Sequence, residues 1–359
     1  METIAIILML IGVVVPLVGL VMLVISLIKK KAKKKPLIIL LAGILCFIIG
    51  GIIMPTEPTV EPEVQNPTAN ESGSISKLIK NAVLQYPASN EIFKYNVYDT
   101  YIEITEYIGS QEATSITVPA KLENLPVYVV DHRVFDMCKV PTIIFEEGIY
   151  DIKSGFSSSL VSVTLPSTLD YVGGYQFKNC YALKNVVIPE GIDSIQVGAF
   201  ESCSKLKEIT IPSTVKEIST GVFAYCTSLE KVNLSNGMKT IGEKAFVQCK
   251  NLKSIDIPDT VETIKFNAFQ GSGLVSVEIP ASVTKIGASA FLACESLKEV
   301  KVHNSDVTIE PQTYESNGVA MGTHTTLFGQ CNKDLVVYGK PASAIARTCA
   351  EENVSFKAF

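Results

Sequence analysis

The chain has 359 residues, 47% of them hydrophobic, a mean hydropathy of +0.30 and a formal net charge of −5. Six of its 31 basic residues are lysines between positions 29 and 35, and one of its 36 acidic residues precedes Pro36, which leaves 25 basic against 35 acidic residues elsewhere. This acidic remainder argues against a nucleic-acid partner, because phosphate binding requires a basic face.

Two apolar segments open the chain. Residues 4–28 contain no charge, residues 37–54 contain none either, and the lysine-rich sequence KKKAKKK separates them. A helix of about 20 apolar residues crosses the hydrocarbon core of a bilayer, so each segment is long enough to span. Lysines stay on the cytoplasmic side, so residues 1–54 are predicted to form a transmembrane helical hairpin with a cytoplasmic loop. Everything after Met54 is then expected to be extracytoplasmic.

A cleaved signal peptide is the alternative for this region. The first segment has Glu2 and no basic residue before its apolar core, which fits a signal peptide poorly. The second segment follows the lysines, and cleavage near Gly50 remains open. Cys46 follows Leu45 rather than a small residue, so we interpret it as an apolar side chain rather than a lipid attachment site.

A spacer and a cap are expected before the repeats. Residues 55–74 are rich in proline and glutamate and contain too few apolar residues to form a core. Residues 75–110 should then form a short helix, which Ser74 caps and Pro87 stops, followed by an N-terminal cap built on a β-hairpin over 92–110. A cap is needed because the end of a solenoid would otherwise expose apolar edges.

Residues 111–359 are dominated by a repeat of 21–23 residues. Aligned phenylalanines mark about nine turns, and most of them are followed three residues later by a cysteine. Each unit begins with an alternating strand that ends at a proline, as in Leu206 to Pro212. A fixed period in the twenties indicates a solenoid, in which each turn covers the apolar face of its neighbour. The aligned phenylalanines are Phe135, Phe156, Phe177, Phe200, Phe223, Phe246, Phe269, Phe291 and Phe328.

The repeat pattern LxxIxIPxxVxxIGxxAFxxC resembles the BspA-like leucine-rich repeats, also called the Treponema pallidum type. IPSTVKEISTGVF and IPASVTKIGASAF lie close to the pattern, and the closing VYGKPASAIARTCAEENVSFKAF is similar to the usual ending of that family. The chain departs from the pattern at Ser235, at Gly271-Ser-Gly and over 138–160. The resemblance implies a leucine-rich-repeat β-solenoid on a bacterial or protist cell surface, where members are associated with adhesion.

Two features vary the end of the repeats. The last interval between aligned phenylalanines is stretched by an insertion at 304–327, and long loops on rigid scaffolds often carry recognition. The sequence after it predicts a C-terminal helix that starts near Pro341, buries Ile345 and Cys349, and ends at Asn353. That helix is expected to cap the solenoid.

The chain lacks the motifs of catalysis, cofactor binding or metal binding. The three histidines have no second ligand at metal spacing, and no CxxC, HExxH or GxSxG motif occurs. Six of the nine cysteines share one repeat position, so we interpret them as buried thiols. Cys331 and Cys349 are placed outside that column, with a disulfide between them as an alternative. No catalytic residue, no cofactor and no metal are therefore expected.

The candidate binding surface is the outer face of the main sheet, where two columns of polar side chains run along the solenoid. Solenoids commonly bind partners on such a face, although solvated strand residues would look the same in the sequence. A cation site at Asp256 and Glu278 is a weaker interpretation. The selected residues are Asn185, Glu208, Thr210, Lys231, Asn233, Ser254, Asp256, Ser276, Glu278, Glu299 and Lys301.

Three functional hypotheses follow. The first is a membrane-anchored cell-surface protein that binds a protein or glycan on another surface, in an adhesion-like manner and without a cofactor. The second is a structural envelope component that associates with itself. The third, an enzyme, would need a site within the insertion at 304–327 that no motif marks.

Overall fold

The structure is a computed structural model that describes residues 72–359, apart from 317 and 318. The expected transmembrane segments 4–28 and 37–54, and most of the spacer 55–74, lie outside the described residues. Among the described residues, no helix is long and apolar enough to span a membrane.

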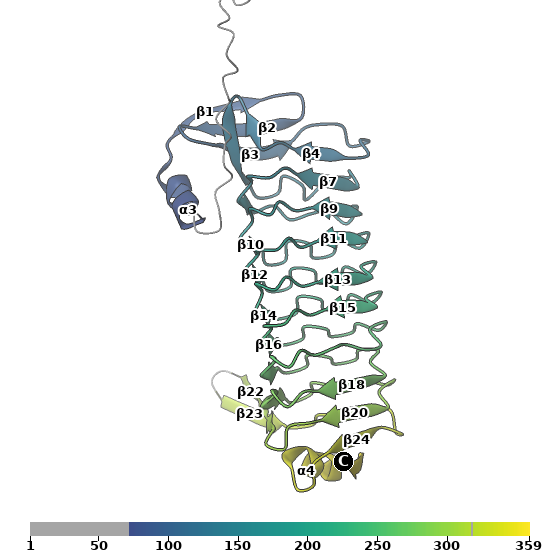
Figure 1. Ribbon diagram of the computed structural model, residues 1–359. Helices are drawn as coiled ribbons and strands as arrows, with labels where there is room; N and C mark the ends of the chain where they lie inside the picture. The colour runs from purple at the N-terminus through teal and green to yellow at the C-terminus, as the bar shows by residue number, and fades with distance from the viewer. Residues whose placement is uncertain (1–71, 317–318) are drawn as a thin grey trace, which may run out of the picture. The chain divides into compact units, whose positions relative to one another are not determined.

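The described chain winds into a β-solenoid with one short strand per turn on each of two sides (Figure 1). Neighbouring turns on the first side are in register: Asn185 pairs with Ser162, and Glu208 pairs with Lys231. The strands on this side, which we call the strand face, are β4 (Ile116–Val118), β7 (Thr142–Phe145), β9 (Ser162–Thr164), β11 (Asn185–Val187), β13 (Glu208–Thr210), β15 (Lys231–Asn233), β18 (Ser276–Ile279), β20 (Glu299–Val302), β24 (Val336–Gly339) and β25 (Ser355–Ala358).

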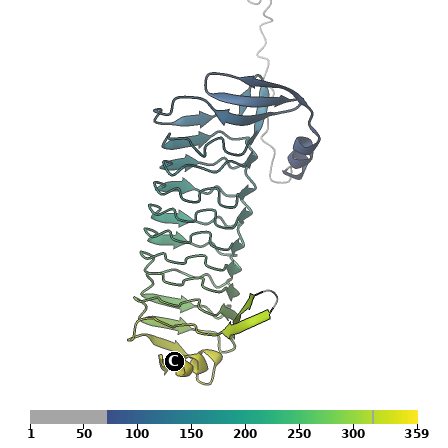
Figure 2. The ribbon, with the colours of Figure 1, turned by 180° about the vertical axis from the view of Figure 1, so that it is seen from behind.

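Shorter strands form the second side, seen from behind in Figure 2. Seven of them make one continuous parallel sheet in the order β10-β12-β14-β16-β17-β19-β21. The strands on this side are β6 (Leu125–Val130), β8 (Asp151–Ile152), β10 (Tyr171–Val172), β12 (Ser194–Ile195), β14 (Glu217–Ile218), β16 (Thr240–Ile241), β17 (Thr263–Ile264), β19 (Lys285–Gly287) and β21 (Thr308–Glu310).

The solenoid has about eleven turns, two more than the phenylalanine count predicted. The additional turns belong to β24 and β25, which extend the strand face beyond the last aligned phenylalanine. Helix α4 (Ala344–Glu351) stands between them, where the other turns carry their phenylalanine. A count based on that residue could not include these turns.

The interior is lined by the phenylalanine column. All nine rings stack in sequence from Phe135 to Phe328, with centroids 4.7–5.9 Å apart and neighbouring planes within 19° of each other. Eight of the nine are at most 2% exposed, and Phe156 is 6% exposed. The predicted single interior is therefore confirmed.

The thiols form a second column beside the rings. Six of them donate to the carbonyl oxygen of the phenylalanine one turn earlier, with Sγ–O distances of 3.1 Å from Cys226 to Phe200 and from Cys249 to Phe223. Cys331 belongs to this column, contrary to the prediction, because its Sγ lies 2.9 Å from the carbonyl oxygen of Phe291. Cys331 follows Phe328 by three residues, the repeat spacing. The eight described cysteines are all free, so the alternative disulfide is absent from this part of the chain.

The N-terminal cap has one more strand than predicted. Strands β2 (Phe93–Tyr98) and β3 (Ile102–Tyr107) are the expected hairpin, and β3 continues in parallel with β6. Helix α3 (Ser72–Asn81) ends earlier than the prediction from Pro87, which instead lies in the unexpected edge strand β1 (Leu84–Ser89). Proline is compatible with an edge strand because its missing N–H is not needed there.

The C-terminal end agrees with the predicted cap. Ser343 caps α4 and accepts a hydrogen bond from the Ala346 amide, while Ile345 and Cys349 are buried. Asn353 follows the helix in a left-handed conformation, with φ of 55°. The insertion at 304–327 contributes β21 and then a hairpin of β22 (Gln312–Ser316) and β23 (Val319–His324). A short strand β5 (Lys121–Leu122) pairs with β6.

Candidate functional site

The selected surface residues lie on one face of the solenoid, as the alternation along each strand predicts. Their neighbours in the sequence, such as Ile209 and Val232, are buried, so the selected side chains point outward and are exposed or half-buried. Asn185 lies on β11, Glu208 and Thr210 on β13, Lys231 and Asn233 on β15, Ser276 and Glu278 on β18, and Glu299 and Lys301 on β20. Ser254 and Asp256 lie between β15 and β18 in a segment that forms no strand.

The hydrogen-bonded ladder of the strand face is interrupted at this segment, and it is also interrupted between β11 and β13. Within the described residues, no backbone hydrogen bond joins 254–257 to either neighbouring turn, although Val275 still donates to the Lys253 carbonyl just before it. The phenylalanine column passes through the same turns without a gap, since Phe246, Phe269 and Phe291 stack at 5.4–5.5 Å. The interruption is therefore confined to the strand face.

The last residues of this segment lie at the edge of the core. Ile257 is half-buried and packs against the core, as Leu234 does at the same repeat position one turn earlier, whereas Ile211 and Ile279 are 1% and 0% exposed. Pro258 is half-buried like the equivalent Pro189, whereas Pro212 is buried. The nearest departure from the repeat pattern lies one turn earlier, where Ser235 replaces the proline that most repeats have at this position.

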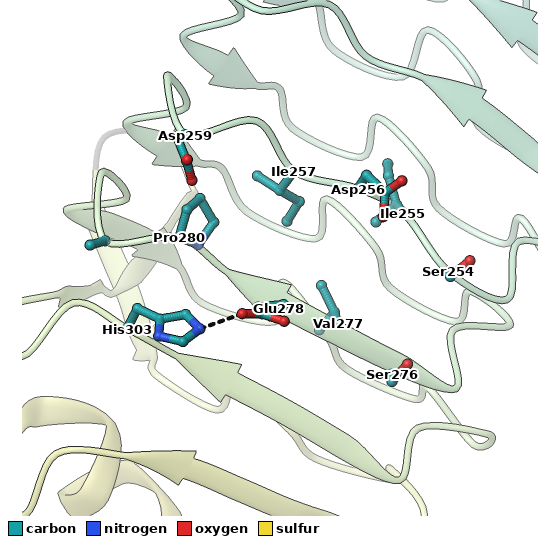
Figure 3. Close-up of a pocket in the computed structure, with 11 residues that line it drawn as sticks. Ser254, Ile255, Asp256, Ile257, Asp259, Ser276, Val277, Glu278, Pro280 and His303 are labelled. Carbon is teal, nitrogen blue, oxygen red and sulfur yellow. Dashed lines mark hydrogen bonds and ion pairs between the residues drawn. The ribbon is translucent and has the colours of Figure 1, made fainter. Parts of the chain in front are cut away.

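A depression opens where the segment separates from β18. It has a volume of 620 Å³ and is lined by residues of this segment and of the β18 turn, together with His303 after β20 (Figure 3). Its lining residues are Ser254, Ile255, Asp256, Ile257, Asp259, Ser276, Val277, Glu278, Pro280, Ala281 and His303. Four of the selected residues, Ser254, Asp256, Ser276 and Glu278, are thus brought together, and the other seven lie on the face outside it.

Of the three carboxylates that line the depression, one has a partner among the described residues. Nε2 of His303 lies 2.6 Å from Oε1 of Glu278, so this carboxylate already has a partner. The carboxylates of Asp256 and Asp259 have no hydrogen bond or ion pair with any described residue. No lysine or arginine lines the depression. It is therefore an acidic site with two uncommitted carboxylates.

The turns next to the depression carry their own pairs. On β20, Nζ of Lys301 lies 3.2 Å from Oε1 of Glu299, and this contact raises the pKa of Lys301. On the other side, the Asn233 side chain donates to the Thr210 hydroxyl at 3.0 Å. The polar side chains on both sides of the depression therefore already have partners within the strand face.

His303, Asp259 and Ile257 were not selected from the sequence. His303 takes the repeat position that proline occupies at Pro258 and Pro280. Aligning the repeats with one another would have shown this replacement of a proline by a titratable side chain. Its ring also stacks on Phe359, with centroids 5.3 Å apart, which ties the depression to the end of the chain.

The described residues contain no group of three or more His, Cys, Asp or Glu side chains arranged to hold a metal ion. Asp256 and Glu278, the pair considered for a cation in the sequence, are therefore not part of such a group. The insertion supplies a projecting hairpin, where Nδ1 of His324 lies 3.2 Å from the Ser289 hydroxyl. The chemistry available at the depression is hydrogen bonding and charge.

Comparisons with known proteins agree with this architecture. The model of the BspA type leucine rich repeat region matches in six copies, over residues 100–230 and 216–321. A search of curated proteins gives no match. A leucine-rich repeat protein from Bacteroides ovatus is 24% identical in sequence, with a TM-score of 0.54 over 70% of this chain and 71% of that one.

Two further solved structures are similar. A leucine rich cell surface protein from Faecalibacterium prausnitzii is 24% identical, with a TM-score of 0.49, and the match covers 72% of this chain and 66% of that one. The leucine-rich repeat protein of T. pallidum is 18% identical, with a TM-score of 0.30 over 76% of this chain and 98% of that one. The likeness to the Bacteroides ovatus protein, at 24% identity, concerns the fold.

Proposed function

The chain belongs to the BspA type leucine-rich repeat family, and from this premise we propose that it is a membrane-anchored cell-surface protein that binds a macromolecular partner non-covalently. The partner would be a protein or a glycan on another surface. Residues 4–28 and 37–54 would hold the chain in the membrane with the solenoid outside the cell. The anchor is supported by the length of the two apolar segments and by the lysines between them.

The observation that supports binding is the strand face itself. It presents side chains from successive turns, in register within the groups β11-β9-β7-β4, β13-β15 and β18-β20-β24-β25, and neither a helix nor a loop of the described chain covers it in Figures 1 and 2. The face also exposes apolar side chains, with Val187 73% and Ile144 37% accessible. A rigid surface with mixed polar and apolar side chains suits recognition because little conformational entropy is lost on binding.

The opposite side is less suited to recognition because its charges are paired across turns. Nζ of Lys239 lies 2.5 Å from Oε1 of Glu262, and Nζ of Lys265 lies 2.7 Å from Oε1 of Glu217. Such exposed pairs contribute little stability, but they leave fewer charges free for a partner. The strand face, with its uncommitted carboxylates, is the better candidate.

The test is capture of partners by the full-length chain in lipid nanodiscs, against arrays of matrix proteins, glycans and bacterial surfaces. We expect capture that Val187→Arg weakens at least tenfold, since a long charged side chain would obstruct the face. Val197→Arg is the matched control, because Val197 is exposed but lies outside the strand face. Light scattering of the same particles separates partner binding from self-association, which would favour the envelope-component alternative.

Placement needs a separate measurement. Intact cells are treated with a membrane-impermeant amine reagent, and labelled peptides are identified by mass spectrometry. Lysines of the solenoid such as Lys231 should react, whereas the cluster at 29–35 should react only after the cells are permeabilised. Labelling of the cluster in intact cells would exclude the proposed orientation.

A further inference from the structure

Two cysteines at the C-terminal end of the thiol column are placed to react as a pair. We propose that Cys294 and Cys331 form a redox-active dithiol, which a small-molecule disulfide oxidises to a disulfide bond between neighbouring turns. This modification site is separate from the strand face and requires no binding partner, so it goes beyond the proposed function. The register of the two turns, the exposure of Cys331 and the polar contacts of Cys294 support it.

The two turns keep the register of the solenoid, although the insertion at 304–327 lies between them. Ala293 donates to the Gly329 carbonyl oxygen at 2.7 Å, which is the bond that joins the equivalent residues of earlier turns. Chains paired in this way run about 4.8 Å apart. Cys294 and Cys331 each follow an aligned phenylalanine by three residues, so they occupy stacked positions. This spacing lies within the Cα separation of about 4.4–6.8 Å that a disulfide needs.

The two cysteines also meet at one acceptor. The Cys331 Sγ lies 2.9 Å from the carbonyl oxygen of Phe291, and the main-chain nitrogen of Cys294 lies 3.3 Å from the same oxygen. A thiol of one turn and the backbone of the other cysteine are therefore in contact with a single peptide group. Little movement is needed to bring the two sulfurs together.

Ser272 separates this pair from the rest of the column. It takes the cysteine position of its own turn, and its hydroxyl oxygen lies 3.4 Å from the Sγ of Cys294. Cys249 is one turn further away, so the adjacent thiol in the column for Cys294 is that of Cys331. The two residues thus form a pair rather than part of a longer row of thiols.

Exposure distinguishes this pair from the other stacked thiols. Among the described cysteines, Cys331 is half-buried and the other seven are buried. Cys226 and Cys249 have the same arrangement in neighbouring turns, but both are 0% exposed. A reagent in solution can therefore reach Cys331, whereas it cannot reach either thiol of the Cys226 and Cys249 pair while the solenoid is folded.

The polar contacts favour a proton shared between the two sulfurs. A hydrogen bond from the Cys331 thiol, with a further one from the Ser272 hydroxyl, lowers the pKa of Cys294. The same contact with Cys294, together with burial and the nearby Glu352 carboxylate, raises the pKa of Cys331. Cys294 therefore loses its proton first and accepts from Cys331. Transfer of that remaining proton to Cys294 leaves the thiolate, which is the nucleophile, on the accessible sulfur.

Oxidation by a disulfide then proceeds in two exchange steps. The Cys331 thiolate attacks one sulfur of the reagent, breaks its S–S bond and releases one thiolate, which leaves a mixed disulfide on Cys331. Cys294 gives its proton to water, and its thiolate attacks the Sγ of Cys331 and expels the second reagent thiolate. The protein has then lost two electrons and two protons, and the reagent has become two thiols. The new bond closes the chain that carries the insertion into a loop.

The experiment uses the full-length chain in nanodiscs and 2-hydroxyethyl disulfide, which is small and neutral. After incubation at pH 8 the remaining thiols are alkylated in denaturant, and non-reduced peptides are analysed by mass spectrometry. We expect a cross-linked peptide of Cys294 and Cys331, whereas Cys226 and Cys249 should be recovered alkylated. A bond from Cys331 to Cys349 instead, the absence of any cross-link, or equal oxidation of Cys226 and Cys249 would each overturn the proposal.

Variants separate the two steps. Cys294→Ser places serine where position 272 already has it, and it should retain the mixed disulfide on Cys331 at least tenfold longer than the native chain does. Cys331→Ser should remove the reaction, and Cys226→Ser, the matched control, should react as the native chain does. Equal persistence of the mixed disulfide in the native chain and in Cys294→Ser would show that Cys294 does not resolve it, which would overturn the pair. Thermal unfolding verifies that each variant is folded.

Discussion

The Sγ of Cys226 lies 3.1 Å from the carbonyl oxygen of Phe200, and this contact joins two successive turns of the solenoid. The same contact recurs from Cys203 to Phe177 at 3.2 Å and from Cys294 to Phe269 at 3.1 Å. The phenylalanine is therefore used twice in each turn, by its ring in the stack and by its carbonyl as an acceptor. A thiol fits this position because it is small, apolar and a weak donor.

Burial should make the thiols of Cys180, Cys203 and Cys249 unreactive. Desolvation raises the pKa of Cys180 to about 12, and burial also raises the pKa of Cys203 and Cys249 well above the ordinary value. The thiolate is the reactive form, so alkylation at pH 8 should be slow in the folded chain and fast in denaturant. Peptide-level mass spectrometry after iodoacetamide treatment measures each site separately. Rapid native-state modification of Cys203 would contradict the buried column.

The same shifts predict how stability depends on pH. Desolvation raises the pKa of Cys180 and of Cys349 from 9.0 to about 12 in the folded chain. The unfolded chain therefore loses these protons first, so the stabilisation is complete below pH 9 and decreases between pH 9 and 12. Each such thiol contributes a slope of about −1.4 kcal/mol per pH unit in that window. Urea titrations at several pH values give the slope, and Cys180→Ala should reduce it.

Removing a ring from the stack should destabilise the solenoid. Phe223 is fully buried and lies between Phe200 and Phe246, with centroids 5.6 Å away on both sides. Phe223→Ala should lower the free energy of unfolding by about 3–5 kcal/mol, because it leaves a cavity as well as losing apolar burial. Tyr225→Ala, two residues away and half-exposed, is the control and should cost much less. A similar loss in both variants would argue against the column.

Close approach of successive turns requires glycine at position 242. A Cβ added to Gly242 would lie 2.1 Å from the carbonyl oxygen of Ile218 in the preceding turn, which a side chain cannot avoid. Gly242→Ala should therefore lower the melting temperature by several degrees, since one kcal/mol shifts it by about 2–4 °C in a domain of this size. At Gly174 the nearest atom would be 3.5 Å away, so Gly174→Ala should be tolerated. Equal melting temperatures for both variants would contradict the packing.

Most of the fold could be predicted because the same sequence pattern recurs in successive turns. The period gives the solenoid, alternation in units such as Leu206 to Ile211 gives the inward and outward side chains, and Pro212 gives the strand end. The positions that were missed are those where the chain departs from the repeat. Strand β1 contains Pro87, and the last two turns have no aligned phenylalanine, so the pattern gave no signal for either.

The candidate site was predicted in part. The alternation identified the outward columns, including Ser254, Asp256, Ser276 and Glu278, because it depends only on the local strand geometry. It could not identify which of these residues share a depression. That depends on whether 254–257 joins the ladder, and its sequence, SIDIP, has the same alternation as strands that do join.

By itself, the sequence determined the repeating turn, the buried columns of phenylalanine and cysteine, and the face on which polar side chains are displayed. These follow from side-chain period and hydrophobicity, which are local properties. Only the tertiary structure decided that the segment 254–257 forms no strand with its neighbours, and that His303 pairs with Glu278 beside it. The fit between neighbouring turns depends on contacts between residues more than 20 positions apart, and the pattern within one repeat contains no information on that fit.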